Sequence, residues 1–100
     1  MKIAILLPFK DTYTTNKAGS ASIWVKDFIK NSKYKNNISI YGYIKNLDNK
    51  LLIDKNKYKN IEYNFDYFIG SKNKKYVQLF SKLIKRKKID LVEIHNRPSY

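Results

Sequence analysis

The chain has 100 residues, enough for one domain at most. It has no cysteine and a single histidine, which excludes a disulfide framework, a thiolate nucleophile or metal site, and a zinc site built by histidine alone. The net charge of +13 is typical of polyanion-binding proteins, but arginine supplies only Arg86 and Arg97, and a lysine-dominated surface is a weak sign of sequence-specific nucleic-acid recognition.

A continuous apolar run opens the chain, from Ile3 to Leu7, and Pro8 closes it. Such a run predicts a strand that is covered on both faces, as in the centre of a parallel sheet. It is too short for the apolar region of a signal peptide and far shorter than a membrane span. The sequence therefore favours a cytoplasmic protein.

A polar loop from residue 10 to 18 leads to Gly19, where a helix is expected to start. Ser20 or Ser22 can cap it, and apolar residues recur at helical spacing up to an end near residues 31–34; they are Trp24, Val25, Phe28 and Ile29. Gly19 has two equally weighted interpretations, an anion site at the helix N-terminus or a plain turn. Neither the Gly-x-Gly-x-x-Gly nor the Walker pattern is present, which argues against NAD or ATP, and we expect no cofactor.

Two further strands are predicted in the middle of the chain. Residues 38–44 are β-branched and aromatic, and the order strand, helix, strand implies a right-handed parallel crossover. Residues 61–65 alternate apolar and polar, which predicts an edge strand. Residues 45–60 give no clear prediction, since their lysines and asparagines favour loop and Leu51-Leu52-Ile53 fits a short strand or helix.

A second helix is expected after Gly70-Ser71, with one apolar side formed by Tyr76, Val77, Phe80, Leu83 and Ile84. Lys85, Arg86, Lys87 and Lys88 crowd its end. The simplest interpretation is a solvated cluster that complements the negative end of the helix dipole. The alternative is a patch for membrane or nucleic acid.

A buried final strand is predicted from Ile89 to Ile94, and it delivers His95, Asn96 and Arg97 to its carboxyl end. Ligands of open α/β sheets bind at that edge, so His95 is a candidate acid, base or hydrogen-bond donor, although a lone histidine is more often structural. Arg97 can clamp an anion or pair with Glu93 or Asp90. Glu93 is unusual in a central strand and must reach a helix partner or an edge.

The predicted fold class is α/β, a Rossmann-like parallel sheet of order 3-2-1-4 with helices on both faces. Two helices cover such a sheet incompletely, which suggests part of a larger unit. Three segments together carry a family likeness: the opening strand closed by Pro8, the stretch Ala18-Gly19-Ser20-Ala21-Ser22-Ile23-Trp24-Val25, and Val92-Glu93-Ile94-His95-Asn96-Arg97-Pro98. With them, the chain resembles the N-terminal, acceptor-side half of the two-domain enzymes of glycosyltransferase family 4.

The resemblance implies a truncated GT-B type enzyme: residues 1–100 form the first Rossmann-like domain, and the C-terminal donor-binding domain is absent. It places Gly19 and Ser20 near the donor phosphates and the acceptor, His95 as the catalytic residue near the transferred sugar, and Asn96 and Arg97 beside it in the acceptor cleft. The expected partners are a nucleotide-sugar donor, a glycan or lipid acceptor and the missing domain. No metal is implied, and this chain alone is expected to be inactive.

The implied role is surface polysaccharide or lipopolysaccharide synthesis in the cytoplasm, with peripheral contact at the inner face of an anionic membrane and no specific nucleic acid as partner. The competing hypothesis is a stand-alone basic module that docks on anionic lipid or nucleic acid through the lysines that end at Lys88. Binding of that kind weakens steeply as the salt concentration rises, which separates the two hypotheses.

Overall fold

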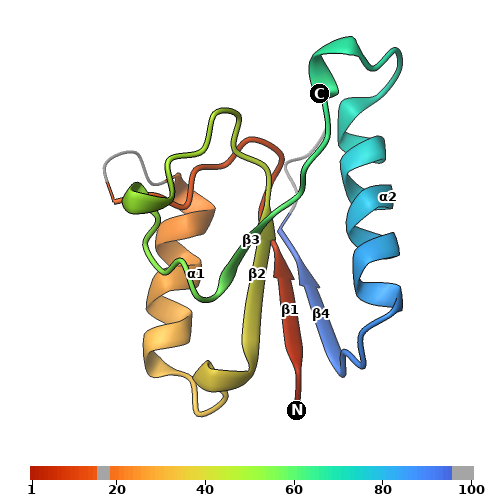
Figure 1. Cartoon of the computed structure of the whole chain (residues 1–100). Coiled ribbons are helices and arrows are strands. Elements are labelled where there is room, and N and C mark those ends of the chain that lie inside the picture. The colour runs from red at the N-terminus through yellow and green to blue at the C-terminus, as the bar shows by residue number, and fades with distance from the viewer. Residues whose placement is uncertain (16–18, 96–100) are drawn as a thin grey trace.

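The computed structural model describes residues 1–15 and 19–95, which form one parallel sheet between two helices (Figure 1). The strands lie in the order β3-β2-β1-β4, which confirms the predicted α/β, Rossmann-like arrangement. The elements are β1 (Ile3–Leu6), α1 (Ser20–Asn31), β2 (Ile38–Gly42), β3 (Tyr58–Asn60), α2 (Lys72–Lys85) and β4 (Leu91–Ile94). None of the helices in this described part is long and apolar enough to cross a membrane.

β1 is an inner strand of the sheet, because it pairs with β2 on one side and with β4 on the other. Its side chains alternate between two cores, as the period of two requires. Ile3 and Ile5 pack in the cluster that contains Val25 and Ile29 of α1. Ala4 and Leu6 pack in the cluster that contains Tyr76 and Phe80 of α2. The two helices therefore cover opposite faces of the sheet (Figure 1).

The predicted apolar face of α1 is only half right. Val25 and Ile29 are buried against the sheet, whereas Trp24 and Phe28 are largely exposed and stack on each other with ring centroids 5.2 Å apart. Trp24 also contacts His95, which follows β4. These two aromatic residues thus lie toward the β4 side of the helix, where the described part of the sheet ends.

The predicted edge strand at residues 61–65 is wrong, and β3 lies just before it at Tyr58–Asn60. The Asn60 side chain explains where pairing stops: its Oδ1 accepts the Ile44 N–H at 2.8 Å, and its Nδ2 donates to the Ile44 carbonyl at 3.3 Å. A side chain thereby takes the place of the next strand residue. Ile61 and Phe65 are buried in the α2 core instead of alternating along a strand, and a 3-10 helix follows at Phe65–Tyr67.

β4 was expected to be buried, and this expectation is wrong. Leu91, Val92 and Ile94 are exposed, because β4 is an edge strand that pairs only with β1 among the described residues. Most of the predicted apolar side of α2 faces the core: Tyr76 and Phe80 are buried, and Val77 and Ile84 are partly buried. Leu83 is exposed. The Ser71 hydroxyl caps α2 by accepting the Lys74 N–H.

Candidate functional site

The carboxyl ends of β1, β2 and β4 meet at the upper edge of the sheet in Figure 1. His95 directly follows β4, and its N–H donates to the Leu6 carbonyl at 2.8 Å, so the ladder holds its backbone at this edge. Gly19 and Ser20 mark the start of α1. The Ser20 side chain is not described, and Asn96 and Arg97 lie outside the described residues.

The His95 imidazole lies between Trp24 and Glu93. Its ring centroid is 5.1 Å from that of Trp24, and Nε2 lies 3.2 Å from Glu93 Oε1. The Nε2 atom is buried and has no hydrogen bond of good geometry among the described residues, so the contact with Glu93 is one of proximity. The whole side chain is nevertheless 22% exposed. Part of the side chain is therefore open to solvent.

The Glu93 carboxylate lies within β4, on the side of the sheet that α1 covers. It pairs in register with Ile5, whose side chain belongs to the α1 core, so Glu93 lies on the α1 side of the sheet. Because β4 is an edge strand, its carboxylate stays partly solvated at 36% exposure. Of the two possibilities raised for Glu93, the structure shows the edge: the carboxylate emerges there, beside His95.

A buried carboxylate at the start of α1 was missed by sequence reasoning. Asp11 Oδ2 accepts hydrogen bonds from the Ser22 N–H at 3.1 Å and from the Ser22 hydroxyl at 2.8 Å. Gly19 occupies the N-cap position and has no side chain to cap the helix, so Asp11 does this from the preceding loop. The signal in the sequence is an acidic residue in a polar loop that precedes a glycine-capped helix.

Gly19 has a packing role in this structure. A Cβ at Gly19 would lie 1.7 Å from Asp11 Oδ1, far inside contact distance, so only glycine lets the carboxylate approach. Asp11 also places a negative charge at the positive end of the helix dipole. An anionic ligand at Gly19 and Ser20 would share this helix end with Asp11, and its binding stays a prediction.

Aromatic packing fixes the carboxyl edge on the α2 side. Phe9, which follows β1, stacks on Tyr43 with centroids 5.5 Å apart and meets Phe65 edge to face at 4.9 Å. The Tyr76 hydroxyl donates to the Leu7 carbonyl at 2.6 Å. Burial raises the pKa of the Tyr76 hydroxyl well above its usual range, with smaller contributions from Tyr58 and Asp11. The end of β1 is therefore held rigidly where its loop begins.

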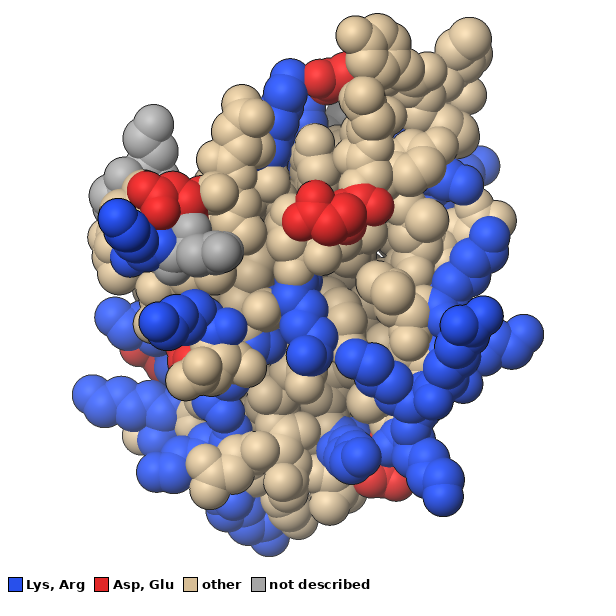
Figure 2. Space-filling view, viewed as in Figure 1, with Lys and Arg blue, Asp and Glu red and all other residues tan. Residues whose placement is uncertain are grey.

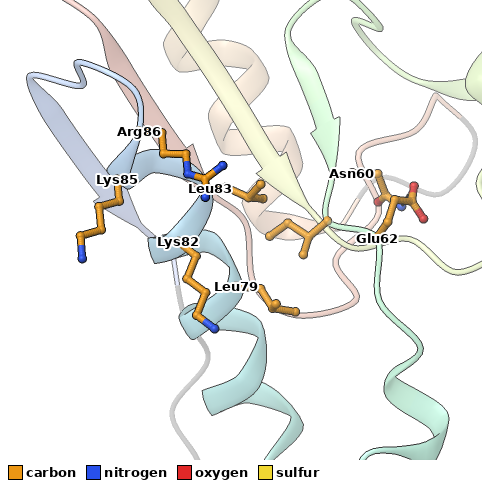
Figure 3. A pocket seen from close by; sticks show the side chains of 8 residues that line it. Asn60, Glu62, Leu79, Lys82, Leu83, Lys85 and Arg86 are labelled. Carbon is orange, nitrogen blue, oxygen red and sulfur yellow. Dashed lines mark hydrogen bonds between the residues drawn. The ribbon is translucent and has the colours of Figure 1, made fainter.

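Two hollows lie away from His95. One is a groove of about 570 Å³ between α2 and the segment after β3, with an apolar floor that includes Leu79 and Leu83 (Figure 3). Lys82, Lys85 and Arg86 of α2 line one side of it, and Asn60 and Glu62 line the other. The second hollow lies at the amino ends of the strands and is rich in basic residues, namely Lys2, Lys57, Lys59, Arg86, Lys87 and Lys88.

Comparisons of the chain with protein-family models, with curated proteins and with solved structures found no match in any of the three. The described residues contain no group of three or more histidine, aspartate or glutamate side chains that could hold a metal ion. The strand order makes the chain a Rossmann-like α/β protein. Its likeness to a glycosyltransferase family stays a prediction from its sequence.

Proposed function

We propose that the chain is the acceptor-side half of a retaining, GT-B type glycosyltransferase that resembles family 4. It would transfer a sugar from a nucleotide-sugar donor to a glycan or lipid-linked acceptor, in surface polysaccharide or lipopolysaccharide synthesis at the cytoplasmic face of a membrane. The observation that supports this most is the position of His95. Its partly exposed side chain lies at the carboxyl edge of the sheet, against the first half of α1.

In this proposal His95 donates a hydrogen bond to the sugar near the reaction centre. Nε2 is buried 3.2 Å from Glu93 Oε1, so the other ring nitrogen would be the donor to the sugar. The leaving diphosphate helps to deprotonate the acceptor, while Gly19, Ser20, Asn96 and Arg97 contribute to holding the substrates. The chain's role is then orientation and stabilisation of charge.

The exposed edge of the sheet supports the idea of a larger enzyme. β4 leaves Leu91, Val92 and Ile94 exposed, although strands of parallel sheets are normally covered on both faces. A further part of the enzyme would cover this edge, and the donor-binding domain would supply the paired acidic residues for the nucleotide sugar. We therefore expect the purified 100-residue chain to transfer no sugar from UDP-glucose, UDP-galactose, UDP-N-acetylglucosamine or GDP-mannose.

The proposal is tested at the gene's own locus, where any additional domain is retained. His95→Ala introduced there should remove a surface glycan or its lipid-linked precursor, as detected by gel electrophoresis and mass spectrometry of the cell envelope. Lys30→Ala, an exposed change in the last turn of α1, is the matched control and should leave the glycan unchanged. An envelope that stays unchanged both in the His95→Ala strain and after deletion of the gene would contradict the proposal.

A second candidate function has one observation in its favour. Basic side chains gather over the lower half of the face shown in Figure 2 and along α2, around the hollow that Lys2, Lys57, Lys87 and Lys88 help to line. A surface of this kind attracts polyanions. If it binds them as its function, affinity for single-stranded RNA should fall steeply with salt and be lost in Lys87→Gln/Lys88→Gln, while His95→Ala changes nothing.

A further inference from the structure

Two large apolar side chains project from the segment that precedes α2. Tyr67 is 84% exposed and Ile69 is 96% exposed, the two most exposed of the large hydrophobic residues in the described chain. Folded proteins seldom place neighbouring apolar side chains so fully in water unless they meet another surface. Residues 66–69, called the tip here, lie at the upper right of Figure 1, above α2.

The packing beneath the tip fixes its outward direction. Phe65 is buried and meets Tyr43 edge to face at 4.6 Å, and Phe68 meets Tyr63 at 6.3 Å. Phe65 thus anchors the chain just before the tip and Phe68 anchors it from within, whereas Tyr67 and Ile69 face away from the core. Gly70, with φ of +123°, makes the turn into α2 that a residue with a side chain rarely adopts.

Several lysines lie near the tip. The Lys75 ammonium lies 5.8 Å from the centre of the Phe68 ring. Lys45 forms an ion pair with Asp66 and holds the pKa of that carboxyl below its usual range, with weaker contributions from Lys72 and Lys10. These four ammonium groups outweigh the single carboxylate of the tip itself. Exposed apolar side chains with lysines nearby suit a surface with an apolar interior and anionic head groups.

We propose that the tip docks on an anionic lipid bilayer, with Tyr67 and Ile69 inserted at the interface and the surrounding lysines among the head groups. Phe65 packs against Phe9 and Tyr43, which follow β1 and β2, so the tip lies at the carboxyl edge of the sheet. Docking would turn the edge that carries His95 toward the lipid. The inference deepens the membrane location within the proposed function, and it rests on that function only for the identity of the acceptor.

Vesicle co-sedimentation tests the docking surface with the 100-residue chain. We expect binding to vesicles of equal parts phosphatidylcholine and phosphatidylglycerol, and weaker binding to phosphatidylcholine alone. Tyr67→Ser/Ile69→Ser should lower the partition coefficient by about 10-fold or more, because the two apolar side chains that would be buried in the bilayer are lost. Ile23→Ser is the matched control: Ile23 is 51% exposed on α1, and its loss should leave the partition coefficient unchanged.

A fluorescent reporter tests insertion separately. Trp24→Phe removes the single native tryptophan, so that Tyr67→Trp supplies the only indole. Its fluorescence emission should move to shorter wavelength when the anionic vesicles are added and should be quenched by brominated lipid. The emission of an indole introduced by Ile23→Trp in the same background should do neither. Equal binding by wild type and Tyr67→Ser/Ile69→Ser, or loss of binding in Lys87→Gln/Lys88→Gln alone, would overturn the proposal. His95→Ala should bind vesicles normally, so failure of docking is distinguishable from failure of sugar transfer.

Discussion

Asp11 and Ser22 are joined by two hydrogen bonds across the start of α1. One carboxylate oxygen accepts both the backbone N–H and the hydroxyl of Ser22, although the two residues are eleven positions apart. The carboxylate does what a side chain at the N-cap position normally does, because Gly19 cannot. The loop after β1 and the helix that follows it are therefore one structural unit.

Replacing Asp11 should destabilise the protein through this helix end. Asp11→Ala leaves the Ser22 N–H without its partner in a buried position, and we expect the free energy of unfolding to fall by about 1–3 kcal/mol. Chemical denaturation measures the loss. Asp27→Ala, which removes an exposed carboxylate from the same helix, is the control and should change stability by less than about 0.5 kcal/mol. Equal effects of the two substitutions would show that Asp11 does not cap the helix.

Gly19→Ala should be destabilising, and the cause should be Asp11. The added methyl group would lie 1.7 Å from Asp11 Oδ1, so the carboxylate would have to leave the Ser22 hydrogen bonds. A double-mutant cycle checks this: Gly19→Ala should cost clearly less free energy of unfolding in the Asp11→Ala background than in the wild type. Additive effects would mean that the two residues do not interact.

The sheet order could be predicted from the sequence because its signals are local. The continuous apolar run of β1, the β-branched run of β2 and the helical spacing around Tyr76 each follow from short-range pattern. The third strand could not be placed, because its end depends on a tertiary contact. Asn60 bonds to Ile44, sixteen positions away, and turns the following residues out of the sheet.

Tyr76→Phe should lower stability without changing the fold. The lost hydroxyl donates to the Leu7 carbonyl at 2.6 Å in a buried site, so that carbonyl would lose a hydrogen bond. We expect the free energy of unfolding to fall by about 1–2 kcal/mol. Tyr67→Phe removes a hydroxyl from an exposed ring and serves as the control. Similar denaturation midpoints for the two variants would argue against this role of the bond.

Buried tyrosines should make the fold sensitive to alkali. Burial raises the pKa of Tyr13 from 10.0 to about 12, and the Asp54 carboxylate adds to the shift. The unfolded chain then loses this proton before the folded one does, so the stabilisation is fully present below pH 10 and is lost as the pH rises toward 12. Between these values the thermal midpoint of the wild type should fall more steeply than that of Tyr13→Phe. If the thermal midpoints of the two proteins fall equally with pH, the raised pKa of Tyr13 is contradicted.

The candidate site was less predictable than the fold. His95 could be placed at the carboxyl edge because it directly follows an apolar strand, and the structure puts it there. Its neighbours could not be predicted in the same way. Trp24 was expected in the core, yet it lies at the open side of the sheet beside His95, and Asp11 reaches α1 through the fold of its loop. Such contacts arise only when separate elements pack together.

We expect the His95 imidazole to serve sugar transfer at the carboxyl edge of the sheet. The most direct measurement is the rate of transfer from radiolabelled nucleotide sugars to endogenous acceptors in extracts of cells that carry His95→Ala or Lys30→Ala at the gene's own locus. We expect the transfer activity to fall by about 100-fold in His95→Ala, as for the loss of one hydrogen-bond donor to a developing charge, and to be unchanged in Lys30→Ala. An activity that depends on the gene but survives His95→Ala undiminished would contradict it.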